Sequence, residues 1–216
     1  SSEKPDKPIY YTIDNTEPTI NSKKYIKPFI INNTTIIKAA VFNNNKPAGK
    51  IMKQTFSFHK AIGKTIHYNS LFSNRYPGSG DATLINGING SKSYNDGKWQ
   101  GWKKNNAEII IDLHKKEIIK NLSISFLESH DVWIFLPKKV NISFSNDLKT
   151  FFNEKEIIIK QNNKNSPPNR QLFKTENLNL NYRYIKLIIK NQKFCPDWHN
   201  GSGGDCWLFI DEVQVN

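Results

Sequence analysis

The chain has little of several features that would assign it to a simple functional class. It contains only two cysteines and one methionine among 216 residues, so a small scaffold held by many disulfides is excluded. No apolar run approaches the roughly 20 residues that a membrane-spanning helix needs. The first residues lack a signal-peptide pattern, and helical periodicity is almost absent throughout. These absences leave an all-β globular chain that is either cytosolic or processed from a longer protein.

Positive charge is plentiful but is not concentrated in one place. The formal net charge is +12, and the parts before and after residue 60 each carry +6 of it. A nucleic-acid-binding protein usually gathers lysine and arginine on one face or helix. Arginine, which makes most bidentate base contacts, is scarce in this chain. The charge pattern therefore argues against a nucleic-acid partner.

Short apolar or alternating runs separated by turn residues predict many β-strands. Typical turn sequences are "DNTEP", "NNNKP", "YPGSG", "NGING" and "NKNSPPN". The predicted strands cover residues 9–13, 34–42, 54–59, 108–113, 121–128, 139–145, 156–160, 183–190 and 207–215. Such a series of short strands is typical of β-sandwiches.

The strand pattern stops at "HKAIGK", residues 59–64, which predicts a domain boundary. We expect one module over residues 1–60 and a second over residues 61–216. About 60 residues are marginal for an independent core, so we expect the first module to lean on its neighbour or on upstream sequence. A strand predicted almost at the first residue favours a fragment of a longer protein.

Cys195 and Cys206 flank a glycine-rich loop, "PDWHNGSGGD". A bridge between them would close a short loop and contribute about 2–3 kcal/mol by the chain-entropy estimate. Two free buried thiols are the alternative, and the spacing alone leaves both open. Without a second cysteine pair or suitably spaced histidines, the two residues are a poor zinc signal.

Residues 9–58 contain "YYTIDNTEPTINSKKYIKPFII" followed by a strand ending in "IKAAVF". This pattern resembles the small immunoglobulin-like module near the C-terminus of bacterial chitobiases and β-N-acetylhexosaminidases. Asn15 stands where that module usually has glycine, and asparagine also tolerates left-handed backbone angles. The resemblance implies a spacer rather than a binding site.

Residues 64–216 carry an ordered set of motifs: "DATLINGINGSKSYNDGKWQGW", "AEIIIDLHKKEIIKNLSISFLE", "VWIFLPKKVNISFSND", "RYIKLIIKN" and "WLFIDEVQV". In this order they resemble a discoidin, or coagulation factor type C, domain. Among such domains they are most similar to the family 32 carbohydrate-binding modules of secreted glycoside hydrolases, notably family 20 hexosaminidases. The resemblance implies an eight-stranded jelly-roll sandwich, a linked catalytic domain upstream, and a secreted, periplasmic or cell-surface location in a bacterium.

The resemblance also implies a structural Ca²⁺ where the first long loop meets the last strand. The implied ligands are side-chain oxygens and main-chain carbonyls of Thr83, Asn86, Ile88, Ser91, Asp211 and Glu212. Calcium takes six to eight hard oxygens and tolerates irregular geometry. Asn86 replaces the aspartate of the family and removes one charge. A different cation, a water molecule, or a plain turn beside a solvated Glu212 are the alternatives.

A sugar has an apolar C–H face and a rim of hydroxyls, so it needs a stacking ring and a few polar groups on loops. The candidates are Trp198, His199, Asp197, Asn200, Trp99, Asn95 and His130. The expected ligands are glycans ending in galactose, GalNAc or GlcNAc. Trp198 either stacks on a sugar or plugs the end of the sandwich. By alternation, Trp133 and Phe135 share one face, and both are expected to be buried.

Nothing in the sequence predicts catalysis. A glycosidase needs two carboxyls about 5–10 Å apart, and strand alternation would turn Asp211 and Glu212 to opposite faces. No Gly-x-Ser-x-Gly or His-Glu-x-x-His motif is present. We therefore expect a non-catalytic, carbohydrate-binding fragment. The alternatives are modules that only brace a catalytic domain, or adhesion to a protein or anionic surface.

Overall fold

The computed structural model describes residues 7–216 and divides the chain into two compact units, Ser1–Phe58 and His59–Asn216. The division lies two residues before the boundary expected after residue 60. His59 belongs to the second unit because its ring is hydrogen-bonded to Glu212 of the last strand. The first six residues of the expected N-terminal module lie outside the described residues.

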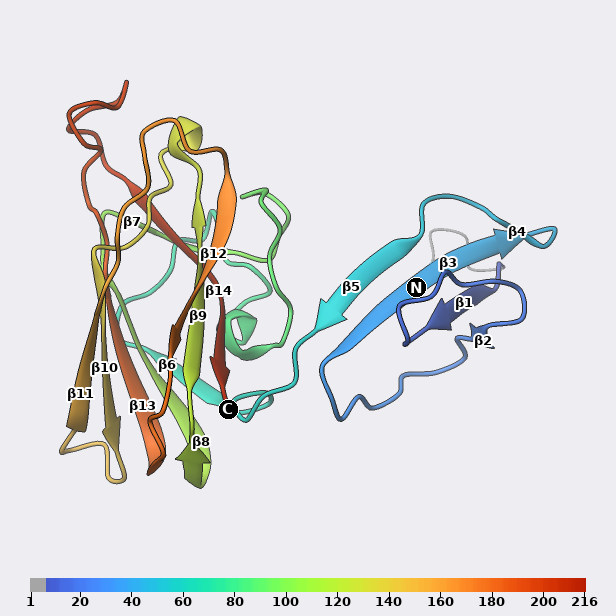
Figure 1. Cartoon of the computed structure of the whole chain (residues 1–216), viewed down its shortest axis with the longest axis horizontal. Helices are drawn as coiled ribbons and strands as arrows, with labels where there is room; N and C mark the ends of the chain where they lie inside the picture. The colour runs from blue at the N-terminus through green and yellow to red at the C-terminus, as the bar shows by residue number, and fades with distance from the viewer. Residues whose placement is uncertain (1–6) are drawn as a thin grey trace. The chain divides into compact units, whose positions relative to one another are not determined.

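The first unit is a small antiparallel sheet in the order β2-β1-β3-β4, with β5 also paired to β3 (Figure 1). Its strands are β1 (Ile9–Thr12), β2 (Lys23–Lys24), β3 (Thr35–Asn43), β4 (Lys46–Pro47) and β5 (Met52–Phe56). Asn15 has φ 65°, the left-handed angle for which asparagine substitutes for glycine. Asn44 and Asn45 have φ 48° and 62° in the tight hairpin between β3 and β4, as a type I′ turn requires.

The second unit is a sandwich of two antiparallel sheets (Figure 1). One sheet has the order β11-β10-β13-β8-β6, and the other has the order β12-β9-β14-β7. The strands are β6 (Thr65–Tyr68), β7 (Gln100–Lys103), β8 (Ala107–Ile119), β9 (Leu122–Glu128), β10 (Lys139–Ser145), β11 (Phe152–Ile158), β12 (Asn169–Thr175), β13 (Leu180–Lys190) and β14 (Trp207–Val215). The all-β jelly-roll class is confirmed, with one strand more than the eight implied.

Alternating side chains from both sheets form the core. Ile109 and Ile111 of β8 meet Ile124 and Phe126 of β9 in one cluster, and all four are at most 2% exposed. The outer face of β9 is also buried: Leu127 packs in a second cluster with Trp99, which lies at the end of the 69–99 loop. Because this long loop covers the outer face of the four-stranded sheet, its aromatic residues serve packing.

Sequence patterns missed β6, β7 and β12, each of which is an edge strand of its sheet. β6 and β12 are only partly buried and carry polar residues such as Asn169 and Gln171, so their apolar alternation is weak. β7 is largely buried, but its four residues are too few to show an alternating pattern.

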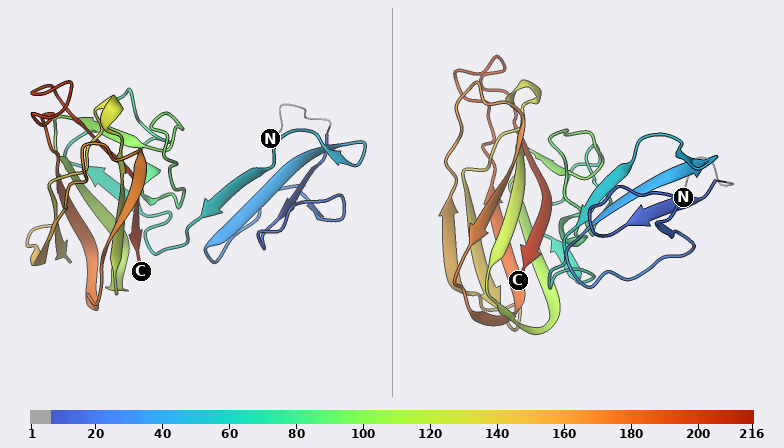
Figure 2. Two further views of the ribbon diagram at one scale, coloured as in Figure 1. Left: turned by 45° about the horizontal axis from the view of Figure 1, so that its top comes forward. Right: turned by 45° about the vertical axis from the view of Figure 1, so that its right-hand side comes forward.

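The sandwich has two functionally different ends. Figure 2 places η2 (His130–Val132), drawn yellow, and the red 193–206 loop at one end, with the C-terminus at the other. Strand register agrees, because Glu128 at the far end of β9 pairs with Asn169, whereas Leu122 at its start pairs with Thr175. No helix among residues 7–216 is long and apolar enough to cross a membrane.

Candidate ligand-binding rim

The rim is formed by two segments that are distant in sequence, residues 130–133 and 194–206. After β9 the chain makes the short helix η2, and Trp133 closes it with φ 65°, a left-handed angle rare for a bulky residue. This turn breaks the alternation on which the sequence prediction rested. Phe135 is buried at 2% exposure, as expected, but Trp133 is 39% exposed. The expectation that Trp133 is buried was therefore wrong.

Trp133 explains the glycines of the second segment. Its indole lies directly against Gly201 and Gly204, where an added Cβ would come within 2.4 Å and 2.6 Å of ring atoms. A side chain at either position would displace the ring. The glycine run in the 193–206 loop thus makes room for Trp133, and it is the sequence signal from which this contact could have been predicted.

His199 ties the two segments together. Its Nε2 donates to the carbonyl of His130 at 2.9 Å, and its Nδ1 accepts from the N–H of Gly201 at 2.9 Å. These partners require the neutral tautomer with the proton on Nε2. Since both ring nitrogens are engaged, His199 positions the loop and has no free nitrogen to bond a ligand.

His130 lies beneath the rim. It is 6% exposed, and its two ring nitrogens face two acceptors, Glu128 Oε1 at 3.0 Å and the carbonyl of Lys164 at 3.2 Å. Both ring nitrogens are therefore engaged within the protein, and neither is free to bond a ligand. The ring stacks on Phe135 at 4.8 Å and contacts Trp198 edge-on at 5.1 Å. The prediction that His130 contacts a ligand was therefore wrong: the buried imidazole instead packs against Trp198 and supports it.

Two exposed indoles remain on the rim surface. Trp198 is 44% exposed and Trp133 is 39% exposed, and their rings lie 5.8 Å and 5.9 Å from the imidazole of His199. The exposed polar residues beside them are Asp131, Asp197 and Asn200. Aromatic faces held on fixed neighbours, next to carboxylates and an amide, supply both kinds of contact that a sugar requires.

Two further predicted ligand contacts lie elsewhere. Trp99 is 1% exposed and packs on Gly90 in the cluster beneath the 69–99 loop, so no ligand can stack on it. Asn95 is exposed in the loop before β7, where its side chain bonds Ser93 of the same loop. The structure therefore brings His130 together with residues 197–200 and leaves Trp99 and Asn95 outside this group.

The predicted calcium region is organised by a β-bulge. The pairing of β14 with β9 shifts between Ile210 and Val213, so Asp211 and Glu212 do not alternate as a regular strand would. Asp211 accepts from the N–H of Gly90 at 2.7 Å, and the N–H groups of Gly87 and Ile88 face Glu212. Both carboxyls therefore point to the 86–90 loop, and the prediction of opposite faces was wrong.

Asp211 is neutralised by protein groups. Its carboxylate forms an ion pair with Arg170 Nε at 2.6 Å and also bonds the Ser125 hydroxyl. Arg170 in turn donates to the side chain of Asn89 at 2.8 Å. This buried network links the 69–99 loop to β9, β12 and β14.

Glu212 is 1% exposed, and its Oε1 lies 2.8 Å from His59 Nε2. Burial raises the pKa of Glu212 to about 9, with the nearby Asp211 charge adding to the rise. Burial also lowers the pKa of His59 to about 4. His59 Nδ1 accepts from the N–H of Ala61 at 3.3 Å, so Nε2 carries the proton and donates to Glu212. The pair is uncharged near neutral pH.

These residues do not fit a calcium ion. Burial raises the pKa of the Glu212 carboxyl that should supply the negative charge, its Oε1 is bonded to His59, and the N–H groups of Gly87 and Ile88 face it. Only its Oε2 lacks a direct hydrogen bond. Asn86 Oδ1 accepts from Ile88, and Ser91 Oγ accepts from Ser93 in an exposed turn. Within residues 7–216, no three His, Cys, Asp or Glu side chains are arranged to hold a metal.

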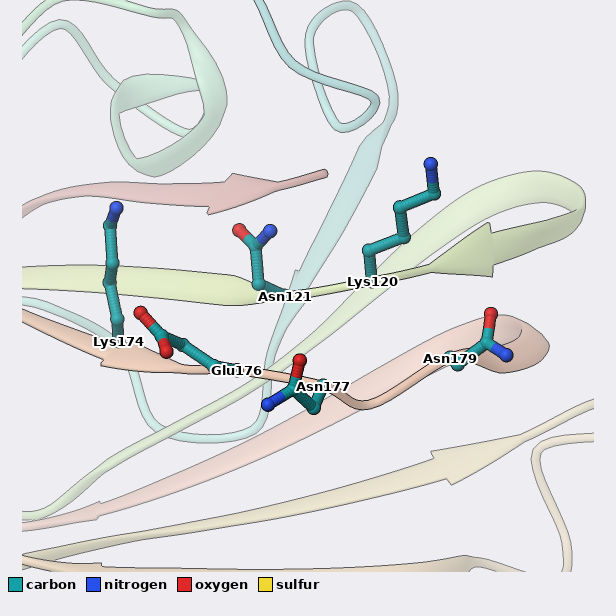
Figure 3. Close-up of a pocket in the computed structure, with 6 residues that line it drawn as sticks. All are labelled: Lys120, Asn121, Lys174, Glu176, Asn177 and Asn179. Atoms are coloured by element: carbon teal, nitrogen blue, oxygen red, sulfur yellow. The ribbon is translucent and has the colours of Figure 1, made fainter.

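A polar hollow of about 370 Å³ lies at the opposite end of the sandwich, between the β8–β9 and β12–β13 turns (Figure 3). It is lined by Lys120, Asn121, Lys174, Glu176, Asn177 and Asn179. Figure 3 shows Lys120, Asn121 and Lys174 pointing to the same side. No aromatic ring lines this hollow, so it lacks the stacking surface that the rim provides.

Two family models match the chain. The model described as "Fn3 associated" matches residues 1–56, and the model described as "F5/8 type C domain" matches residues 65–210. No curated protein matches.

Several solved structures are similar to the second unit at low identity. One is a fucose-binding module of Streptococcus pneumoniae, with 13% identity, 74% of this chain and 97% of that chain covered, and a TM-score of 0.48. Another is the lectin domain of lectinolysin complexed with Lewis B antigen, with 13% identity, 74% of this chain and 97% of that chain covered, and a TM-score of 0.47. A third is a module produced by Clostridium perfringens, in complex with GlcNAc-α-1,4-galactose, with 13% identity, 73% of this chain and 92% of that chain covered, and a TM-score of 0.43.

Proposed function

The chain belongs to the F5/8 type C domain family through residues 65–210, and we propose that this part binds glycans at the rim. The observation that carries the proposal is the pair of exposed indoles, Trp133 and Trp198, which both contact the ring of His199. Single exposed rings are common, but exposed rings gathered in one place and rimmed by polar residues are typical of interaction sites. Asp131, Asp197 and Asn200 supply hydrogen bonds to sugar hydroxyls beside these rings.

The chemistry of the rim favours terminal sugars, with galactose, GalNAc and GlcNAc as the expected classes. A sugar end presents one apolar face and several hydroxyls, which suits a shallow aromatic surface with polar neighbours. A single weak site of this kind becomes useful when it is linked to another module, because linkage raises the local concentration of substrate. The proposed function is therefore to tether a linked module to glycans.

The linked module is proposed to be a glycoside hydrolase, such as a β-N-acetylhexosaminidase, secreted, periplasmic or on a bacterial surface. The basis is the order of motifs that resembles its C-terminal region, with the "Fn3 associated" segment preceding the F5/8 type C domain. Asp211 and Glu212 are 0% and 1% exposed, so no substrate reaches them.

Calorimetric titration of the whole chain with galactose, GalNAc and GlcNAc tests the proposal. We expect Trp198→Ala or Trp133→Ala to weaken binding roughly tenfold or more, since truncating an aromatic hot spot costs about 2 kcal/mol. The matched control is Phe152→Ala, which removes a ring of β11 that is 53% exposed. No binding of any sugar by the folded protein would reject a glycan-binding role.

Two controls separate the alternatives. If the modules only brace a catalytic domain, Trp198→Ala lowers the melting temperature strongly and no sugar affinity exists to be lost. If the +12 charge mediates adhesion to an anionic surface, binding collapses as NaCl rises toward molar strength. Binding by stacking on a sugar changes little over the same range.

A further inference from the structure

The two cysteines of the chain lie together at the base of the loop that carries Trp198. Cys195 Sγ and Cys206 Sγ are 3.5 Å apart as free thiols, although ten residues separate them in sequence. The backbone around them is already paired: Cys195 donates to Gly204 at 2.8 Å, and Cys206 donates to Lys193 at 2.8 Å. The two ends of the loop are therefore held in register before any covalent bond is made.

The surroundings of the pair limit its chemistry. The thiols are 3% and 0% exposed and form a small apolar cluster with Phe135. Burial raises the pKa of both thiols, that of Cys206 more strongly. A nucleophile or a metal ligand must be a thiolate, and among the described residues no third ligand completes a metal group here. A disulfide between Cys195 and Cys206 is the chemistry that remains.

We propose that Cys195 and Cys206 form a disulfide that closes the 196–205 loop and holds Trp198 and His199 in place. One thiolate attacks a small disulfide such as oxidised glutathione, giving a mixed disulfide and releasing one glutathione thiol. The second protein thiolate then displaces the other glutathione, so the two cysteines are oxidised and the reagent is reduced to two thiols. Because both cysteines are buried in the folded chain, this exchange takes place during folding or when the loop opens.

The crosslink has two consequences. It restricts the unfolded chain and so raises stability. It also limits the freedom of the loop that carries Trp198, and a ligand surface that is ordered beforehand loses less entropy on binding. The second consequence rests on the proposed glycan binding, whereas the first does not.

Refolding the whole chain in a mixture of oxidised and reduced glutathione, with a parallel sample in reductant, tests the crosslink. We expect free-thiol titration in denaturant to fall from two thiols per chain to none, and peptide mapping to join the segments containing Cys195 and Cys206. The oxidised protein should melt roughly 5–10 °C above the reduced one. The Cys195→Ser/Cys206→Ser variant should melt at one temperature in both conditions. Two free thiols in correctly folded, oxidatively refolded protein would overturn the proposal.

Titration with the three sugars in the oxidised and reduced states forms a separate arm. Tighter binding by the oxidised protein supports the role of the crosslink in ordering the rim. A crosslink that forms while neither state binds any sugar leaves the disulfide standing and rejects the proposed function.

Discussion

Glu212 illustrates how much one buried carboxyl depends on its immediate contacts. A charged carboxylate in an apolar interior is costly unless it is paired, and here its neighbour is a neutral imidazole. Asp211, one residue earlier, is equally buried but is matched by Arg170. Burial raises the pKa of both adjacent acids, but only Asp211 has a cation beside it, Arg170, to oppose the rise.

The raised pKa of Glu212 predicts that the free energy of unfolding depends on pH. The raised pKa of Glu212, about 9 against 4.5 for an ordinary glutamate, means that its contribution to stability is complete below pH 4.5 and is lost as pH rises toward 9. His59 acts in the other direction but only below pH 6.5, as pH falls toward 4. Between pH 6.5 and 9 Glu212 therefore makes the main contribution to the slope, and the buried thiols of Cys195 and Cys206, whose pKa values are also raised, add to it only near the upper end.

Glu212→Gln, which cannot ionise, should remove the fall in unfolding free energy between pH 6.5 and 9. Urea denaturation at a series of pH values measures this slope. Glu154→Gln, an exposed replacement on β11, serves as the control and should keep the decline. An unchanged slope in Glu212→Gln would show that Glu212 is already ionised in the folded protein.

At the scale of elements, two local departures from regular strand geometry create the rim and its support. The short helix η2 turns Trp133 outward after β9, and the bulge in β14 turns two acids toward the 86–90 loop. Each departure is held by contacts with a segment remote in sequence. Trp133 rests on the glycines of the 193–206 loop.

Gly201→Ala tests the coupling between η2 and the 193–206 loop. Its Cβ would lie 2.4 Å from the Trp133 ring, so one of the two segments must shift. Overpacking of this kind costs about 1–3 kcal/mol, and we expect a lower melting temperature, altered tryptophan fluorescence and weaker sugar binding. Ser202→Ala, at an exposed position in the same loop, should leave all three measurements unchanged. Wild-type fluorescence and stability in Gly201→Ala would show that Trp133 does not rest there in solution.

At the scale of the molecule, side-chain contacts between segments far apart in sequence help to close the sandwich of the second unit. The first loop meets the last strand through the Arg170–Asp211 ion pair and the His59–Glu212 hydrogen bond. His59 stands at the very start of this unit. The chain entering the sandwich therefore takes part in fastening its first loop to its last strand.

We accordingly expect calcium to have no effect on stability. Melting temperatures in millimolar CaCl₂ and in EDTA should agree within error for the whole chain. A rise with calcium that disappears in Glu212→Gln would show that an ion binds at the predicted place. A rise that persists in that variant would place an ion elsewhere.

The sequence by itself determined the class of fold, the central strands and the loop that carries Trp198. Alternation of apolar residues sufficed for these because a side chain in a regular strand faces the core or the solvent according to its position alone. The edge strand β12 was not predicted, because it is only partly buried and its alternation of apolar residues is weak.

Only the tertiary structure decided which candidate residues meet at the rim. His130 and Trp99 were chosen for their chemistry, and their burial depends on neighbours from other strands and loops. Trp133 was assigned to the core because alternation cannot anticipate a left-handed turn stabilised by Gly201 and Gly204, about 70 positions away. Contacts between segments so far apart form only in the folded chain, and for that reason no local pattern encodes them.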